Sequence, residues 1–224
     1  MNGKRQPVLI ILAGPNGSGK TTFSAQLAEH PWGKSCRILN ADNVAEQLGD
    51  WNDAACVAKA QMLVRAQLSE ALDEGVDIMY ETVFSHPSKL DIIRQAREKG
   101  YFVRLFFICT ESPRINIDRV ADRFAKGGHA VPGDKVNNRY TRALMYGAEA
   151  LQLVQRGYVY DNSKVARDAS DAFNLLFRTI NGEQVKLYSA PVEWPQTYQY
   201  LLQDVAGAGA SYLKEAFSSG STDA

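Results

Sequence analysis

The chain has 224 residues, of which 45% are hydrophobic, enough to bury the core of one sizeable α/β domain. Its 25 basic and 25 acidic side chains cancel, which argues against non-specific binding to nucleic acid or to a membrane surface, and no segment is long and apolar enough to span a membrane. The three cysteines, Cys36, Cys56 and Cys109, lack C-x-x-C spacing and are typical of reduced thiols in a cytoplasmic protein.

A phosphate-binding motif lies between the first two predicted elements. Residues 8–13 form a continuous apolar run, typical of a strand buried on both faces of a parallel sheet. Residues 22–28 have the apolar spacing of a helix. Between them, residues 14–21 match G-x-x-x-x-G-K-[ST], the P-loop that binds nucleotide phosphates. The nucleotide-binding residues predicted here are Gly14, Pro15, Asn16, Gly17, Ser18, Gly19, Lys20, Thr21 and Thr22.

The residue types of this motif explain the chemistry that we expect of it. Gly14, Gly17 and Gly19 let backbone N–H groups turn toward phosphate oxygens without a Cβ in the way. The N-terminus of the following helix adds a partial positive charge. Lys20 can reach the β- and γ-phosphates, and the Thr21 hydroxyl can ligate Mg²⁺. The motif therefore predicts a site for nucleotide phosphates and Mg²⁺, with Lys20 as a catalytic residue.

Asp42 follows the second predicted strand, residues 36–39, in the triplet Asn40-Ala41-Asp42. It lies just beyond the carboxyl end of that strand, which is where ligands bind in open α/β sheets. Two interpretations have equal weight. Asp42 can be a general base that takes a proton from a substrate hydroxyl, or it can be the N-cap of the next helix, a role that aspartate favours.

A second polar pair follows the third predicted strand. Residues 53–74 have a helical pattern that Gly75 ends, and residues 76–80 form the strand. Glu81 and Thr82 come next, again at a carboxyl edge. Glu81 can order Mg²⁺ or bind a substrate hydroxyl; the alternative is an ordinary loop carboxylate.

Two helices joined by a glycine-rich break follow the fourth predicted strand, residues 102–109. The first helix begins at Pro113, and the second occupies residues 134–156. Residues 126–133 between them contain three glycines and a proline. This pattern predicts a mobile lid over a nucleotide, at about residues 113–156.

Four arginines lie on these two helices. Arg119 and Arg123 are four residues apart and share one face of the first helix, and Arg139 and Arg142 lie on the second. Lid arginines neutralise the charge on a transferring phosphoryl group; the alternative is an ordinary solvated helix surface. The glycine-rich break favours the catalytic interpretation for Arg123 more than for Arg142.

The last predicted elements are a short fifth strand, residues 158–160, and a hairpin at about residues 173–189. The hairpin is indicated by Asn181-Gly182, the favoured two-residue turn, with β-rich sequence on both sides. A final helix is predicted over residues 194–205.

The repeated order of strand and helix predicts one doubly wound α/β domain over residues 1–206. Its parallel sheet has about five strands with helices on both faces, and it carries a helical lid and the C-terminal hairpin. Residues 207–224 are rich in Ala, Gly, Ser and Thr and are predicted to form a flexible tail.

Several motifs, in order over about residues 7–190, resemble the zeta-toxin family, and more closely its short chromosomal branch. The Gly-Gly-His-x-x-Pro segment of the lid and the Asn-Ala-Asp triplet are the specific part of the resemblance, because a P-loop alone is generic. The motifs are Gly14 to Thr21, Asn40 to Asp42, Glu81-Thr82, Arg119 to Pro132, Arg139-Tyr140 with Arg142, and Tyr160 to Ser163.

The resemblance implies a P-loop kinase fold and transfer of the γ-phosphate of ATP, with Mg²⁺, to the 3′-hydroxyl of UDP-N-acetylglucosamine. By position, Asp42 would be the base, and Lys20 and Thr21 would hold phosphates and Mg²⁺. Glu81 would bind the sugar or order the metal, and Arg123 would clamp the γ-phosphate. The other implied positions are Asn162 for the nucleotide and Thr82 and Arg142 for the substrate.

One departure from the family pattern concerns the lid. Plasmid-borne members place a second catalytic arginine near the position of His129 in this chain. Histidine is only partly charged at neutral pH and does not simply replace a permanent cation, so Arg139 or Arg142 is an alternative source of that charge. The plasmid-borne toxins are also held by a small antitoxin, which makes such a protein a candidate partner.

Two other functions fit the same scaffold, because a fold does not fix a function. The first is a kinase for another small hydroxyl compound, such as a sugar, a nucleoside or an antibiotic. The second is a nucleotide-dependent switch or binding module. Asp42 distinguishes kinase from switch, because only a kinase needs a base at an acceptor hydroxyl.

Overall fold

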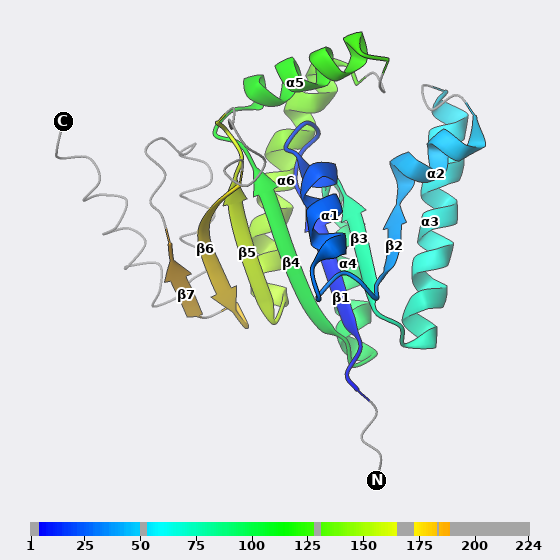
Figure 1. Cartoon of the computed structure of the whole chain (residues 1–224), viewed down its shortest axis with the longest axis vertical. Coiled ribbons are helices and arrows are strands. Elements are labelled where there is room, and N and C mark those ends of the chain that lie inside the picture. The colour runs from blue at the N-terminus through cyan, green and yellow to red at the C-terminus, as the bar shows by residue number, and fades with distance from the viewer. Residues whose placement is uncertain (1–4, 50–52, 128–130, 165–172, 183, 189–224) are drawn as a thin grey trace, which may run out of the picture.

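The structure, a computed structural model, describes residues 5–49, 53–127, 131–164, 173–182 and 184–188. Within these residues the strands form one seven-stranded sheet in the order β2-β3-β1-β4-β5-β6-β7 (Figure 1). The strands are β1 (Val8–Ala13), β2 (Arg37–Asn40), β3 (Ile78–Thr82), β4 (Phe102–Cys109), β5 (Arg156–Asp161), β6 (Asn174–Ile180) and β7 (Gln184–Leu187). Strands β1 to β5 pair in parallel, and β6 and β7 join as antiparallel strands. The predicted parallel sheet with a C-terminal hairpin is therefore confirmed, and the hairpin extends that same sheet.

Helices cover both faces of the sheet, as predicted. The described helices are α1 (Lys20–Glu29), α2 (Ala41–Leu48), α3 (Ala54–Glu74), α4 (Ser88–Glu98), α5 (Pro113–Ala125) and α6 (Gly133–Leu153). Helices α3, α4 and α6 bury their apolar side chains on one face, and α1 lies on the other (Figure 1). The central strands are apolar on both sides because both sides are covered. Along β1, for example, Leu9 and Ile11 belong to the first cluster and Ile10 and Leu12 to the second.

The strand order brings the carboxyl ends of the parallel strands together beneath one helix. Strand β1 lies between β3 and β4, so the chain must cross over it between these two strands. In doubly wound sheets, ligands bind at such a switch point, outside the carboxyl ends of the strands. Helix α5 lies across this edge, and α2 lies at the end of β2 (Figure 1).

The second lid helix is shorter than expected and contributes to the core. Helix α6 ends at Leu153 rather than at residue 156, and β5 begins at Arg156 because partners in β4 and β6 extend it on both sides. From Ala143 to Leu151, α6 buries apolar side chains against the sheet. Val136 and Tyr140 in the first turns of α6 are buried as well, so burial extends along most of the helix.

The hairpin connection is one residue longer than the two-residue turn expected from the sequence. Ile180 pairs with Gln184, so residues 181–183 lie between the strands. Asn181 and Gly182 have φ angles of 51° and 71°, the left-handed region that Asn and Gly tolerate best.

Three of the sequence predictions lie outside the described residues. They are the lid residue His129, the helix at 194–205 and the tail at 207–224.

Candidate functional site

Polar residues follow four of the parallel strands at the carboxyl edge of the sheet. The P-loop follows β1, Asp42 follows β2, Glu81 lies near the end of β3, and Asn162 follows β5. The strand register places these ends side by side, since Asn40 pairs with Glu81 and Leu12 pairs with Glu81 on the other side of β3. Most of the predicted site residues therefore share one edge of the sheet.

The P-loop needs glycine at positions where other parts of the site approach it closely. At Gly17, which has φ 75°, a Cβ would lie 2.7 Å from the backbone oxygen of Asn116 in α5. At Gly19, which has φ 95°, a Cβ would lie 2.4 Å from Nδ2 of Asn162. A larger residue at either position would clash and would also strain the backbone. The glycines thus let the loop pack against α5 and the end of β5.

Lys20 and Ser18 place buried polar groups inside the P-loop. Lys20 is only 8% exposed, and its Nζ donates a 2.8 Å hydrogen bond to the carbonyl of Pro15. Burial lowers the pKa of Lys20, and the carboxylates of Glu81 and Asp42 oppose that change. The Ser18 hydroxyl is fully buried and has no hydrogen-bond partner among the described residues. A buried cation, an unpaired hydroxyl and the N-terminus of α1 together fit a phosphate chain.

Thr21, Glu81 and Asn40 form a connected polar group beside Lys20. The Thr21 hydroxyl donates a 2.8 Å hydrogen bond to Oε1 of Glu81, whose side chain is buried. Burial raises the pKa of Glu81, whereas Lys20 and hydrogen bonds from Thr21 and Asn40 act in the opposite direction.

These residues fit Mg²⁺ only in combination with phosphate oxygens. In the part of the chain that the structure describes, no group of three or more His, Cys, Asp or Glu residues could hold a metal by itself. Mg²⁺ usually takes one or two carboxylates together with substrate phosphates and water. The pair Thr21 and Glu81, next to the phosphate site, has this composition.

The structure overturns one of the two interpretations of Asp42. Asn40 is the N-cap of α2, and its side-chain oxygen accepts a 2.8 Å hydrogen bond from the backbone N–H of Asp42. The N-cap role is therefore wrong for Asp42, which lies in the first turn of α2 with an exposed side chain. The sequence could not decide this point, because Asn and Asp cap helices about equally well.

Asp42 lines a small cavity next to the P-loop. The cavity has a volume of about 210 Å³ and lies between the P-loop, β2, α2, α3 and α5. Its lining residues are Thr21, Asn40, Asp42, Asn43, Ala45, Glu46, Val57 and Arg123. The cavity is smaller than the roughly 300–1,000 Å³ typical of pockets for drug-sized ligands. It can therefore hold the reacting end of a substrate, with the rest of the molecule outside.

The arginines of α5 and α6 occupy different places around the site. Arg123 lines the cavity that contains Asp42. Arg119 donates a 2.7 Å hydrogen bond to the backbone oxygen of Asn162, and Nη1 of Arg139 lies 3.4 Å from Oδ1 of the P-loop residue Asn16. Arg142 is exposed and does not line the cavity.

Asn162 ties the end of β5 to the P-loop. Its Nδ2 donates a 2.8 Å hydrogen bond to the backbone oxygen of Ser18, and its backbone N–H donates to Cys109 at the end of β4. It thus lies at the P-loop, and its role in nucleotide binding stays a prediction. Thr22 is exposed at the start of α1, and Thr82 is half-buried and does not line the cavity.

Sequence analysis missed Asn116, which supports the P-loop from α5. Asn116 is fully buried. Its Nδ2 donates a 2.5 Å hydrogen bond to the backbone oxygen of Asn16, and its Oδ1 accepts from the Thr110 hydroxyl. The hydroxyl of Tyr140 in α6 donates to the backbone oxygen of Thr110. One signal in the sequence could have identified Asn116. It precedes Arg119 by three residues and Arg123 by seven, so it shares their helix face.

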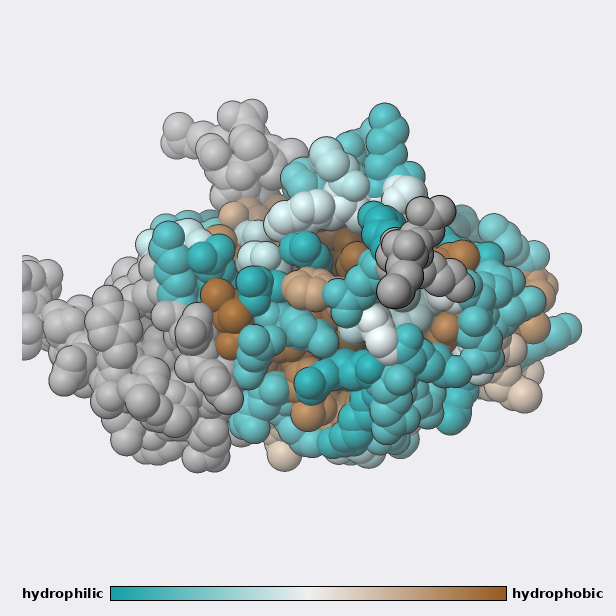
Figure 2. Space-filling model, turned by 90° about the horizontal axis from the view of Figure 1, so that it is seen from below, coloured by the Kyte–Doolittle hydropathy of each residue, from teal (hydrophilic) through white to brown (hydrophobic). Residues whose placement is uncertain are grey.

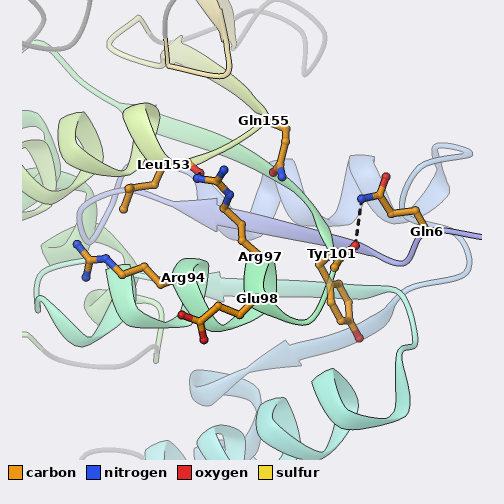
Figure 3. Close-up of a pocket in the computed structure, with 8 residues that line it drawn as sticks. Gln6, Arg94, Arg97, Glu98, Tyr101, Leu153 and Gln155 are labelled. Atoms are coloured by element: carbon orange, nitrogen blue, oxygen red, sulfur yellow. Dashed lines mark hydrogen bonds between the residues drawn. The ribbon is translucent and has the colours of Figure 1, made fainter.

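A second hollow lies at the opposite end of the sheet and has a structural explanation (Figure 3). Its volume is about 440 Å³, and it lies where β1 and β4 begin. Arg97 donates to the backbone oxygen of Leu153 at the end of α6, and Gln6 donates to that of Gly100. The described surface at this end is mostly hydrophilic (Figure 2). Ligands bind at the other end of such sheets, so this hollow is not the candidate site.

No described helix combines the length and apolar character needed to cross a bilayer.

Residues 1–175 match the family described as zeta toxin. An uncharacterized protein of Haemophilus influenzae is 27% identical over 134 residues, which make up 58% of this chain and 91% of that protein.

The fold is shared with solved structures, among them the following two. One comes from the PezAT chromosomal toxin–antitoxin system of Streptococcus pneumoniae, with a TM-score of 0.59 at 19% identity, covering 95% of this chain and 88% of that chain. The other is AvrRxo1-ORF1:-ORF2 with ATP, with a TM-score of 0.61 at 15% identity, covering 96% and 77%. At such identities the likeness shows the fold alone, and it confirms the predicted P-loop kinase-like architecture.

Proposed function

The chain belongs to the zeta toxin family, and we propose that it is an ATP- and Mg²⁺-dependent kinase for a nucleotide sugar. Its reaction would transfer the γ-phosphate of ATP to the 3′-hydroxyl of UDP-N-acetylglucosamine. One observation carries the proposal: the cavity that holds Asp42 opens beside Thr21 of the P-loop. A phosphate chain on the P-loop and a hydroxyl group in the cavity would therefore be neighbours.

The P-loop residues would hold the donor. Backbone N–H groups at the N-terminus of α1, together with Lys20, would bind the β- and γ-phosphates. Thr21 and Glu81 would hold Mg²⁺ between themselves and the phosphates. When bound, Mg²⁺ neutralises charge that develops on the phosphate oxygens. Asn162 would complete the nucleotide site, because it fixes the backbone of Ser18.

Asp42 would be the general base. Its carboxylate would accept the proton of the acceptor hydroxyl while that oxygen forms a bond to the γ-phosphorus. The bond from the γ-phosphorus to the bridging oxygen would break, and ADP would leave. A positioned base contributes about 10²- to 10⁴-fold to such a rate. Arg123, across the same cavity, would stabilise the charge on the transferred group.

Arg139 is the better of the two candidates for the second lid cation. It reaches the P-loop at Asn16, whereas Arg142 is exposed and does not line the cavity. We assign Arg139 the second catalytic role and keep Arg142 as a residue that contacts the outer part of the substrate. Thr82 keeps the substrate-binding role that the family resemblance implies, and His129, which lies outside the described residues, stays the alternative to Arg139 for the second lid role.

We also propose a cytoplasmic location and a small antitoxin as a partner. The three cysteines are odd in number and lack C-x-x-C spacing, which fits reduced thiols and supports the location. The solved PezAT relative is a toxin–antitoxin system, which supports a partner of that kind for this chain.

The proposal is tested by incubating the protein with ATP, Mg²⁺ and UDP-N-acetylglucosamine. ADP release and mass spectrometry of the sugar nucleotide give the two readouts. We expect ADP release that depends on the sugar nucleotide, together with a product that carries one additional phosphate group. Transfer to another hydroxyl compound, with none to any UDP-sugar, would refute the nucleotide-sugar assignment and favour a different small-molecule kinase.

A further inference from the structure

The cavity beside the P-loop contains a second carboxylate that the proposed reaction does not use. Glu46 lies on α2 four residues after Asp42, so the two side chains share one face of the helix. Both line the same 210 Å³ cavity. The exposed side chain of Glu46 is free to meet a ligand that enters there.

The lining of this cavity is acidic and rich in hydrogen-bond acceptors. Of the eight described residues that line it, two are carboxylates, and Arg123 is the single cation. The amides of Asn40 and Asn43 add further acceptors and donors. Two carboxylates one helical turn apart attract hydroxyl or ammonium groups and repel phosphate or carboxylate groups.

The apolar part of the lining lies close to Glu46. Ala45 precedes it on α2, and Val57 faces the cavity from α3. A ring with hydroxyls on its edge and C–H groups on its faces matches this combination of polar and apolar lining. A free phosphate group does not.

We propose that Glu46 is the specificity-determining residue for the acceptor. Its carboxylate accepts a hydrogen bond from a second hydroxyl of the sugar ring, next to the hydroxyl that faces Asp42. This bond fixes which hydroxyl is phosphorylated. Glu46 also rejects sugars that carry an anionic group on the part of the ring that enters the cavity, so the diphosphate of a nucleotide sugar stays outside. The inference rests on the proposed kinase function and identifies the entering part of the acceptor as a neutral, polyhydroxylated ring.

The decisive variant is Glu46→Gln, which retains the size of the side chain and removes its charge. With UDP-N-acetylglucosamine, we expect the KM for the sugar nucleotide to rise about 5- to 10-fold, because the amide oxygen of Gln still accepts a hydrogen bond but a neutral one, about half as strong as that to a carboxylate. The KM for ATP should stay unchanged. Glu70→Gln is the matched control, because Glu70 is exposed on α3 away from this cavity.

Two further readouts separate specificity from a general loss of structure. The wild type should phosphorylate N-acetylglucosamine with a much higher kcat/KM than N-acetylglucosamine 6-phosphate. Glu46→Gln should reduce the ratio of these two kcat/KM values by about tenfold or more. Nuclear magnetic resonance of the product should show one phosphorylated hydroxyl for the wild type and a mixture for the variant. An unchanged KM, together with unchanged discrimination in Glu46→Gln, would overturn the assignment of Glu46 and leave the proposed function intact.

The two proposals can fail separately. If the wild type transfers no phosphate to UDP-N-acetylglucosamine, the proposed function is wrong, and binding then decides the role of Glu46. N-acetylglucosamine is titrated by nuclear magnetic resonance in the presence of a non-hydrolysable ATP analogue. Weaker binding to Glu46→Gln than to the wild type would support the role, whereas equal binding, or no binding to either, would overturn it.

Discussion

Replacing Asn116 by Ala should weaken ATP binding, although Asn116 lies about 100 residues from the P-loop in the sequence. The side chain is fully buried and is bonded at both ends. Its Nδ2 donates to the backbone oxygen of Asn16, and its Oδ1 accepts from Thr110. Asn116→Ala removes both hydrogen bonds and opens space beneath the P-loop.

The expected loss of ATP affinity follows from the hydrogen bonds that Asn16 and Thr110 lose. The oxygen of Asn16 would lose a buried donor, which costs about 1–3 kcal/mol. The Thr110 hydroxyl retains an alternative acceptor, since it also lies 3.1 Å from the backbone oxygen of Ser112. We therefore expect a total effect of about 1–3 kcal/mol. Because the loss falls on the P-loop, the Kd for ATP should rise by roughly 5- to 150-fold.

The assay is an ATP titration by calorimetry, with thermal unfolding measured alongside. Asn138→Ala is the matched control, because Asn138 is exposed on α6. Thr110→Val tests the other end of the network and should have a smaller effect on ATP affinity. If Asn116→Ala bound ATP as tightly as the wild type, the hydrogen bond to Asn16 would have no part in shaping the nucleotide site, and the reasoning would fail.

Three further substitutions test the assigned roles. Lys20→Ala should lower turnover about 10²-fold or more, because it removes the buried cation of the P-loop; a wild-type rate would contradict a catalytic P-loop. Arg123→Ala should lower kcat by about 10³-fold, the range for an arginine that clamps a phosphoryl group, while Arg142→Ala does much less. Equally small effects of both would indicate a solvated surface. Glu81→Gln should raise the Mg²⁺ concentration for half-maximal rate by about 10- to 100-fold, which a Mg²⁺ titration measures; an unchanged requirement would remove Glu81 from the metal site.

The P-loop and the carboxyl-edge residues could be predicted because their signals are local. An apolar strand, a glycine-rich turn and a helix start within about 20 residues specify the position of Lys20. The rule that ligands bind at the ends of parallel strands then points to Asp42 and Glu81 without knowledge of the strand order.

Features that depend on tertiary contacts could not be predicted in the same way. Asn116 looks like an ordinary polar residue of a helix, and its role follows from a contact with the P-loop. Glu46 lines the cavity because α2 packs against α3, and Arg123 of α5 lines the same cavity. The C-terminal half of α6 has a helical pattern that fits a lid as well as a core helix, and only its burial against the sheet decides between them.

The register of the C-terminal hairpin could not be predicted from the sequence either. The dipeptide Asn181-Gly182 correctly marked the turn of the hairpin, but pairing of Ile180 with Gln184 makes the connection one residue longer. Hairpin register depends on cross-strand packing as well as on the turn.

The central claim, that Asp42 is the base at the acceptor hydroxyl, is tested most directly by Asp42→Asn. Asparagine has nearly the same size but cannot accept a proton, and Asn40 continues to cap α2 in the variant. We predict that transfer to UDP-N-acetylglucosamine falls by about 10²- to 10⁴-fold, while ATP affinity and thermal stability remain close to those of the wild type. A stable Asp42→Asn protein that still phosphorylated the sugar nucleotide at a near wild-type rate would contradict the claim.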